Sequence, residues 1–275
     1  MAGAPRPRPR RSLGQHFLSD DNILRRIVEA LEPTPGDVVL EIGPGQGTLT
    51  RELLGRGLRV IAIEKDRRLT EQLRIGDLGL RNAQFVQGDA LRLDWHSLIP
   101  QSAIRHPQWK VVGNIPYYIT TPLIDKALTR PLPERVVFLV QEEVADRIVA
   151  PPGSKTYGAL SVGVQVVARA EKLFTIRPGS FRPPPRVRSA LVRLRPLREP
   201  LVDQQEIPRL RQFVTACFGL RRKQLRNVLR SVTGRSAATV AAGLVALGLD
   251  PQARPEALPP EDFARLLRWE WPPVT

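Results

Sequence analysis

Residues 38–48 read Val38-Val39-Leu40-Glu41-Ile42-Gly43-Pro44-Gly45-Gln46-Gly47-Thr48, and this stretch decides the fold. Its first five residues form an almost entirely apolar run, which is typical of a short buried strand. The three glycines that follow let a ligand approach the backbone closely. Behind them begins a helical pattern, and a helix N-terminus is a polar docking point. A strand, a glycine loop and a helix in this order predict an α/β protein that binds a ligand at the loop.

The glycine loop has two interpretations. A dinucleotide oxidoreductase needs a third glycine three residues after the second, but Thr48 occupies that position. Glu41 stands two residues before Gly43, and the resulting Glu-x-Gly-x-Gly-x-Gly arrangement resembles the S-adenosylmethionine (SAM) loop of class I methyltransferases. This resemblance implies that Gly43 and Gly45 lie against SAM.

Acidic residues follow the next two predicted strands. The strand near 59–63 ends in Glu64, where a carboxylate can accept both hydroxyls of a ribose. The strand near 84–88 ends in Asp89, which is placed to accept from the adenine amine of the cofactor. Open α/β sheets bind ligands at the carboxyl ends of their strands. We therefore expect both carboxylates to line one cofactor site with the glycine loop.

The apolar run 109–113 leads into Asn114-Ile115-Pro116-Tyr117, which resembles an adenine clamp. The exocyclic amine of adenine is a poor nucleophile, because its lone pair is delocalised into the ring. Two acceptors could direct that lone pair at a methyl group: the side-chain oxygen of Asn114 and a backbone carbonyl held beside Pro116. Tyr117 offers a flat surface for an extruded base. The alternative is an ordinary tight turn, since Asn and Pro are common turn residues.

The remaining pattern predicts the organisation of the chain. Strands near 38–42, 59–63, 84–88, 109–113 and 135–140 alternate with helices, which predicts a Rossmann-like, mostly parallel sheet. Two runs, 171–176 and 187–194, should pair antiparallel at its edge. Beyond about residue 200 the pattern is helical only. We expect three parts: a basic disordered arm over 1–12, a SAM-binding methyltransferase domain over 13–198, and a small all-helical, RNA-binding C-terminal domain over 199–275.

The composition points to a polyanionic partner. The chain has 42 Lys and Arg against 27 Asp and Glu, a net charge of +15. Basic runs are often only solvated surface, and a preference for Arg can reflect genomic base composition. Because these runs accompany a base-handling motif, we interpret them as RNA contacts, with three arginines spaced by four on one helix face. The expected RNA-binding residues are Arg182, Arg186, Arg221, Arg222, Lys223, Arg226 and Arg230.

Other cofactor and location classes find no support in the sequence. Cys217 is the single cysteine and the three histidines are scattered, so neither a disulfide framework nor metal-ligand spacing exists. The N-terminal arm lacks the apolar core of a signal peptide, and no apolar run is long enough to span a bilayer. We expect a reduced, soluble, cytoplasmic protein without a metal.

Three further stretches carry a resemblance to one family: Gly14-Gln15-His16-Phe17-Leu18, residues 155–162 and the proline-rich loop 180–190. Together with the clamp they resemble the ribosomal RNA small-subunit adenine N6,N6-dimethyltransferases of the KsgA/RsmA type, from about Leu13 into the C-terminal region. The resemblance implies that His16 and Leu18 join the cofactor site, although relatives often carry Asn in place of His16. It also implies that Phe181 faces the target base. The implied catalytic residues are Asn114, Pro116, Tyr117 and Phe181, and the implied cofactor residues are His16, Leu18, Gly43, Gly45, Glu64, Asp89 and Asn114.

The resemblance implies dimethylation of two adjacent adenosines in a hairpin near the 3′ end of 16S ribosomal RNA, in a pre-30S particle, by a monomer. The macrolide-resistance methyltransferases, which act on large-subunit RNA, are the nearest alternative. The segments 141–147 and 152–155 look more like the assembly enzyme. A non-catalytic assembly or transcription factor is the alternative from another class, and an intact clamp with Glu64 and Asp89 argues against it.

Overall fold

The computed structural model describes residues 9–10, 13–75, 82–105 and 109–270. The chain divides into two compact units, Met1–Ala145 with Glu171–Pro196, and Asp146–Ala170 with Leu197–Thr275. The chain passes from the first unit to the second for the last time between Pro196 and Leu197, near the boundary expected at 198. Residues 146–170, which we expected in the first domain, belong to the second unit. The expected basic arm over 1–12 lies outside the described residues except for positions 9 and 10.

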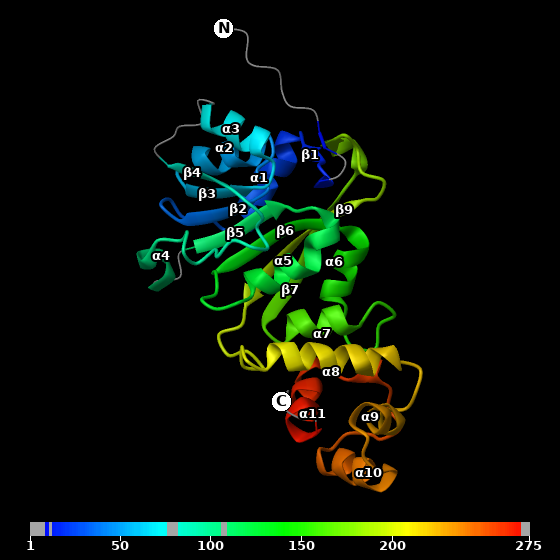
Figure 1. Ribbon diagram of the computed structural model, residues 1–275. Coiled ribbons are helices and arrows are strands. Elements are labelled where there is room, and N and C mark those ends of the chain that lie inside the picture. The colour runs from blue at the N-terminus through cyan, green and yellow to red at the C-terminus, as the bar shows by residue number, and fades with distance from the viewer. Residues whose placement is uncertain (1–8, 11–12, 76–81, 106–108, 271–275) are drawn as a thin grey trace. The chain divides into compact units, whose positions relative to one another are not determined.

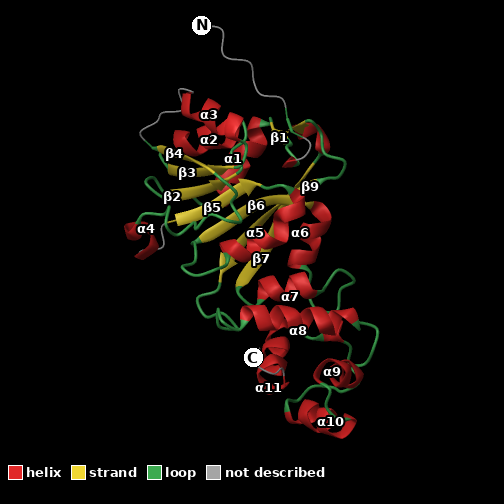
Figure 2. Cartoon of the chain, viewed as in Figure 1, coloured by secondary structure: helices red, strands yellow, loops and turns green. Residues whose placement is uncertain are grey.

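A seven-stranded sheet with the order β4-β3-β2-β5-β6-β9-β7 organises the first unit (Figures 1 and 2). The neighbours from β4 through β6 pair in parallel, and β9 runs antiparallel to β6. The predicted mostly parallel sheet with an antiparallel edge is confirmed. The strands are β2 (Val38–Ile42), β3 (Arg59–Glu64), β4 (Ala83–Gln87), β5 (Trp109–Asn114), β6 (Arg135–Gln141), β7 (Ala168–Ile176) and β9 (Ser189–Pro196).

Helices cover both faces of this sheet (Figure 1). On one face lie α1 (Asp21–Ala30), α2 (Thr48–Gly55) and α3 (Arg67–Ile75), and α5 (Thr120–Ala127) lies on the other. Asp20 caps α1 by accepting hydrogen bonds from two backbone N–H groups of its first turn. The buried side of α1 joins side chains of α2, β2 and β3 in the core. The other helical segments here are α4 (Gln101–Arg105), η2 (Tyr117–Ile119) and η3 (Pro178–Ser180), and α6 (Glu142–Val149) begins in the first unit and ends in the second.

The second unit is helical. Its helices are α7 (Ala159–Gln165), α8 (Ile207–Gly219), α9 (Leu225–Thr233), α10 (Ala237–Ala246) and α11 (Pro260–Glu270), with a short η4 (Pro255–Ala257). The rings of Tyr157, Phe218 and Phe263 pack in series in its core, with centroids 5.8 and 5.7 Å apart. Among the described residues, no helix of either unit is long and apolar enough to cross a bilayer.

The order of the strands fixes where a ligand can bind. The chain runs from β2 outward through β3 to β4, and then returns to place β5 on the other side of β2. Such a reversal opens a crevice at the carboxyl ends of the two central strands. Here those ends carry the glycine loop after β2 and Asn114 at the end of β5.

Candidate active site

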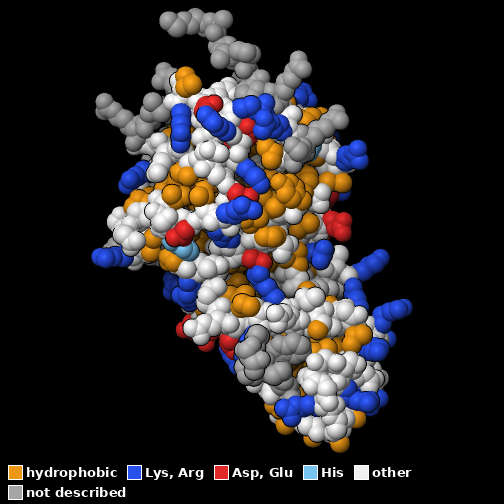
Figure 3. All heavy atoms as spheres, viewed as in Figure 1, with side chains coloured by type: hydrophobic (Ala, Val, Ile, Leu, Met, Phe, Trp, Pro, Cys, Tyr) orange, Lys and Arg blue, Asp and Glu red, His pale blue; other side chains and the backbone are white. Residues whose placement is uncertain are grey.

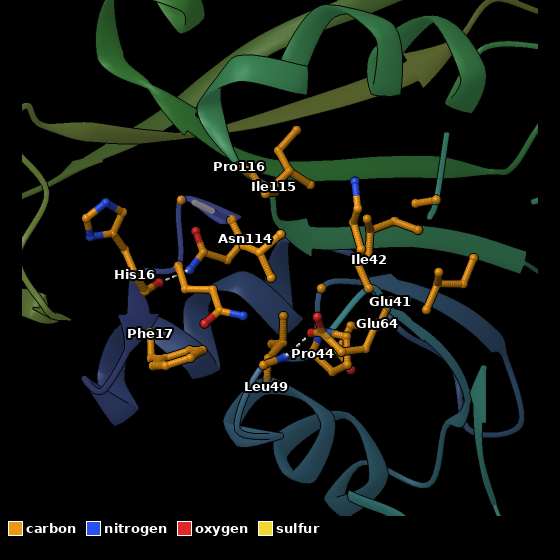
Figure 4. Close-up of a pocket in the computed structure, with 18 of the residues that line it drawn as sticks. His16, Phe17, Glu41, Ile42, Pro44, Leu49, Glu64, Asn114, Ile115 and Pro116 are labelled. Atoms are coloured by element: carbon orange, nitrogen blue, oxygen red, sulfur yellow. Dashed lines mark hydrogen bonds between the residues drawn. The ribbon is translucent and has the colours of Figure 1, made fainter. Parts of the chain in front are cut away.

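A pocket lies in the first unit at the carboxyl ends of β2, β3, β4 and β5. The segment 13–18 forms a further wall, and Figure 4 shows residues of this segment beside those of the glycine loop and the clamp. The structure brings together every expected cofactor residue around this pocket, namely His16, Leu18, Gly43, Gly45, Glu64, Asp89 and Asn114.

The glycine loop presents bare backbone to the pocket. Gly43 and Gly45 have φ angles of 70° and 57°, a region that side-chain-bearing residues rarely adopt. A Cβ at Gly45 would also lie 2.9 Å from the ring of Phe17. Both the conformation and the space therefore require glycine at position 45.

Two buried carboxylates line the pocket, and no cation in the described part of the chain forms an ion pair with either of them. Glu64 is 6% exposed and accepts hydrogen bonds from the backbone N–H groups of Gly45 (3.1 Å) and Asp66 (2.9 Å). Glu41 is 1% exposed and accepts one from the Thr50 hydroxyl at 2.7 Å. Burial raises the pKa of Glu64, and burial with repulsion from Glu64 raises the pKa of Glu41 to about 7. Glu41 was not among the expected site residues, although its place before the glycine loop was a signal for it.

Asp89 lines the pocket in an ion pair. Its Oδ2 lies 2.8 Å from the Nζ of Lys65, and its Oδ1 accepts a hydrogen bond from the Leu91 N–H at 3.0 Å. The hydrogen bond from Lys65 lowers the pKa of Asp89, so this carboxylate is ionised and acceptor-only. Lys65 also lines the pocket, and sequence reasoning missed it. Its signal was its position directly after Glu64.

The clamp residues leave two acceptors free. The Nδ2 of Asn114 donates to the backbone oxygen of His16 at 2.7 Å, as Figure 4 shows, and this bond fixes which way the amide points. Among the described residues, no donor binds the Oδ1 of Asn114 or the carbonyl of Ile115. The carbonyl of Pro116 accepts from the Ile119 N–H at 3.1 Å, so Ile115 supplies the free carbonyl beside the proline.

The two aromatic residues expected at the target base, Tyr117 and Phe181, lie in different surroundings. Tyr117 lines the pocket, and its hydroxyl lies 2.6 Å from the Oγ of Ser189. Phe181 has no exposed surface: it packs in the core and pairs with Leu18 where β1 (Phe17–Leu18) meets β8 (Phe181–Arg182). Phe181 is therefore not among the residues that line the pocket in this structure, and its contact with the target base stays a prediction. Tyr118, which sequence reasoning missed, lines the pocket with 62% of its surface exposed.

The segment 13–18 is tied to its surroundings by polar contacts. The Nε2 of Gln15 donates to Asp66 at 3.3 Å, and the hydrogen bond from Arg68 lowers the pKa of that carboxylate. The Nδ1 of His16 lies 2.8 Å from the carbonyl of Pro183, and it is the donor because a carbonyl only accepts. The ring of His16 thus points away from Glu64 (Figure 4).

The expected RNA-binding residues fall into two groups. Arg182 and Arg186 are exposed in the first unit, and Arg222, Lys223, Arg226 and Arg230 are exposed in the second. Arg221 instead forms an ion pair with Glu256 at 2.6 Å and is half-buried. Arg222 precedes the first residue of α9, so the expectation that one helix carries all three spaced arginines is wrong. Figure 3 shows Lys and Arg side chains on the visible surface of each unit.

The open, mostly parallel sheet, the glycine loop and the acidic ends of the next two strands define a class I SAM-dependent methyltransferase. Solved structures agree with this class. A dimethyladenosine transferase from Plasmodium falciparum superposes with a TM-score of 0.78 at 27% identity, covering 91% of this chain and 96% of that one. The 23S rRNA methyltransferase ErmE superposes with a TM-score of 0.71 at 31% identity, covering 92% and 98%.

The chain belongs to the ribosomal RNA adenine dimethylase family, whose model matches residues 7–269. Curated relatives named ribosomal RNA small subunit methyltransferase A include one from Thermosynechococcus vestitus, 45% identical over 266 residues, and one from Nitratidesulfovibrio vulgaris, 43% identical over 263 residues. Each alignment covers 94% of this chain and 96% of the relative. The predicted family, enzyme class and cofactor are confirmed, and the chain is a SAM-dependent methyltransferase with an RNA substrate.

Proposed function

We propose that this enzyme transfers two methyl groups from SAM to the N6 atom of each of two adjacent adenosines near the 3′ end of small-subunit ribosomal RNA. The observation that carries the chemistry is the pair of free acceptors, Asn114 Oδ1 and the Ile115 carbonyl, beside the cofactor pocket. Two acceptors on one exocyclic amine bind its two N–H groups and orient the lone pair. An ordinary tight turn has no need for such an arrangement.

The pocket suits the chemical groups of SAM. The carboxylates of Glu41 and Glu64 lack a cation within the described part of the chain, and SAM brings positive charge together with two ribose hydroxyls. Glu64 is the acceptor for the ribose, Asp89 accepts from the adenine amine, and the bare loop at Gly43 and Gly45 lets the cofactor approach closely. SAM supplies an electrophilic methyl group on its sulfonium.

The residues of this chain contribute orientation of the amine rather than a base. Asn114, held by the His16 carbonyl, and Ile115, held beside Pro116, keep the amine in the attacking direction. Tyr117, anchored through Ser189, supplies a flat face for the ring. Holding the nucleophile in the right orientation beside the methyl donor lowers the activation barrier substantially through proximity alone. The N6 proton can leave to solvent after transfer, and so no side-chain base is required.

The choice of small-subunit RNA rests on the curated relatives, which are named for that subunit and are 43–45% identical to this chain. We further propose that a monomer acts on the pre-30S particle in the cytoplasm. In this proposal the helical second unit holds RNA through its exposed arginines. Affinity then comes mainly from phosphate contacts, and the clamp selects the adenine.

Large-subunit RNA is the second candidate, because the ErmE structure is similar over almost the whole chain. Mass mapping of methylated adenosines in ribosomal RNA from cells with and without the gene distinguishes the two. We expect N6,N6-dimethyladenosine at two adjacent small-subunit positions only when the gene is present. Loss of a large-subunit mark instead would replace the proposal by the second candidate, and no change in either RNA would refute both.

A further inference from the structure

Lys126 joins the helix that follows the clamp to the turn that carries Asp89. It lies on α5, and its ammonium group donates to the backbone carbonyls of Leu91 and Leu93, at 2.9 and 2.5 Å. Both carbonyls belong to the irregular segment that follows β4. A lysine near the surface usually extends its charge into water. The ammonium group of Lys126 is instead directed at two neutral groups of this turn.

The turn is compact and is held at several points. The backbone N–H of Leu93 binds the carbonyl of Asp89 at 3.0 Å. The indole N–H of Trp95 binds the carbonyl of Ala90 at 2.8 Å, and Trp95 is buried. The Nζ of Lys126 lies 5.5 Å from the centroid of the Trp95 ring, so the two side chains approach the turn together and bind different carbonyls of it.

The same turn orients the side chain of Asp89. Its Oδ1 accepts from the backbone N–H of Leu91 at 3.0 Å, so the residue whose carbonyl Lys126 binds also holds the carboxylate. The two charges also interact through space. Burial lowers the pKa of Lys126, and attraction by Asp94 and Asp89 opposes that shift. A change at Lys126 therefore reaches Asp89 both through Leu91 and through its electrostatic field.

We propose that Lys126 is a positioning residue for the adenine end of SAM, which fixes the turn so that Asp89 points at the exocyclic amine of the cofactor. The proposal rests on the proposed contact between Asp89 and that amine. Each carboxylate oxygen has two acceptor sites, so Asp89 can bind the amine while it keeps its bonds to Lys65 and Leu91. Because α5 follows the clamp through η2, one helix then supports both the clamp and the adenine end of the cofactor.

Two cofactors separate this role from a purely structural one. SAM presents an amine to Asp89, whereas an analogue with hydrogen in place of that amine does not. We expect Lys126→Met to weaken SAM binding, measured by calorimetry, on the order of 10-fold, which is the lower part of the range for hydrogen bonds to charged groups. The analogue should bind Lys126→Met and the wild type equally well. Lys126→Arg keeps a cation that can donate to both carbonyls, and it should retain the preference for SAM.

A second substitution locates the effect at Asp89. Asp89→Ala alone should remove the preference for SAM over the analogue, and adding Lys126→Met should then weaken SAM binding no further. Lys172→Met is the matched control, because this lysine pairs with Glu142 at 3.1 Å and does not line the pocket. Urea unfolding verifies that each variant is folded under the conditions of the titration, and Lys126→Gln replaces Lys126→Met if the latter does not fold.

The outcomes are distinct. Unchanged SAM affinity in Lys126→Met, equal weakening for SAM and the analogue, or a further loss in the Asp89→Ala background would overturn the role of Lys126. A loss of preference in Asp89→Ala without one in Lys126→Met would refute this inference alone and leave the proposed function standing. If Asp89→Ala keeps the full preference for the amine, the proposed cofactor contact of Asp89 fails and the inference fails with it.

Discussion

The two ends of the central sheet carry charged side chains in opposite arrangements. At the end where β2 and β5 begin, the ammonium group of Lys110, which is 1% exposed, forms ion pairs with Asp37 and with Glu134, the latter at 3.1 Å. At the other end of the sheet, Glu41 in β2 and Glu64 at the end of β3 are also buried, but no cation among the described residues pairs with them. One end of the sheet is thus neutralised and the other is not.

At the same end of the sheet, ion pairs also involve arginines of β6 and β9. Glu32 pairs there with Arg135, with Arg193 at 2.8 Å and with Arg195 at 2.5 Å. Burial alone would raise the pKa of Glu32, but the hydrogen bond from Arg195 and the neighbouring charges lower it. The pKa values of Glu41 and Glu64 shift in the opposite direction.

A buried charge without a partner costs free energy. A protein that neutralises buried charge at one end of its sheet and leaves it unpaired at the other can use the unpaired end for a ligand. Functional sites are known to concentrate such shifted groups. We therefore expect the paired charges around Lys110 to stabilise the fold, and Glu41 and Glu64 to contribute to binding of a cationic ligand.

The largest effect should come from the neutralised end. Lys110→Met leaves the carboxylate of Asp37 buried without its cation, and breaking a buried pair in this way typically costs about 3–5 kcal/mol. We expect that loss in the free energy of unfolding measured with urea, while SAM affinity of the folded protein stays unchanged. The exposed pair partner Arg67→Met is a matched control and should change stability little. A Lys110 variant as stable as the control would show that this end contributes nothing to the fold.

The second prediction concerns pH at the pocket end. The pKa of Glu41 is about 7 in the folded protein against an ordinary value of 4.5, so folding favours the protonated carboxyl. Its contribution to stability is present below about pH 4.5 and is lost as the pH rises through 7, by about 3 kcal/mol in total. Glu41→Gln should remove that pH dependence and raise the unfolding free energy at pH 8 by a similar amount.

Several titratable groups lie close to Glu41. Glu64 repels its charge and Thr50 binds it, and Lys65, Asp89 and His16 line the same pocket. Binding of cationic SAM should favour the ionised carboxylate and release a proton near pH 7, which calorimetry in buffers of different ionisation enthalpy detects. Equal proton release by Glu41→Gln would assign the titration to another group.

The third prediction tests the clamp. Asn114→Ala should lower methyl transfer on the order of 100-fold, because the amine loses the group that orients it. RNA binding should be nearly unchanged, since affinity comes mainly from phosphates. Single-turnover kinetics with saturating RNA measure the rate, and Asn22→Ala, at the exposed start of α1, serves as the control. More than half the wild-type rate in Asn114→Ala would remove this residue from the mechanism.

The fourth prediction tests the cofactor site. Glu64→Ala removes the charged acceptor expected for the ribose, and hydrogen bonds to charged groups contribute roughly 1.5–3 kcal/mol. We expect SAM binding to weaken about 10- to 100-fold by calorimetry. Glu64→Gln should retain part of the affinity, because its amide oxygen still accepts. Glu71→Ala on the surface of α3 is the control. Unchanged affinity in Glu64→Ala would leave this residue only its bonds to Gly45 and Asp66.

The sequence predicted the strands well because parallel strands buried on both faces are continuous apolar runs. The strand expected over 38–42 is β2 as observed, and β3 to β6 differ from their expected bounds by one residue at most at either end. The ends of the apolar runs also showed which polar residues stand at the carboxyl ends of the strands. The residues expected at the cofactor therefore line one pocket, as predicted.

What the sequence did not reveal depends on contacts between distant residues. The pairing of β1 with β8 is only two residues long, and it buries Phe181, which a local pattern could not distinguish from an exposed loop ring. Arg221 looked like its basic neighbours until Glu256, far along the chain, proved to be its partner. Residues 146–170 belong to the second unit through packing that composition does not record.

We expect the smallest effect at α9, where unpaired arginines lie near an arginine that is paired with a carboxylate. Arg226 and Arg230 lie one turn apart on this helix and Arg222 just before it; all three are exposed, and none pairs with a carboxylate among the described residues. Arg221 beside them is paired with Glu256. If these unpaired arginines bind RNA phosphates, replacing all three with Ala should weaken RNA binding. The slope of the logarithm of the binding constant against the logarithm of the salt concentration should fall by about 0.7 for each lost contact to a single-stranded phosphate. Arg221→Ala should leave the slope intact and lower the stability of the second unit.

Titration of labelled ribosomal RNA fragments at several salt concentrations measures both variants, with SAM affinity as the control that should not change. A wild-type slope in the triple variant would mean that α9 does not touch RNA, and the exposed Arg182 and Arg186 would then be the better candidates for the phosphate contacts.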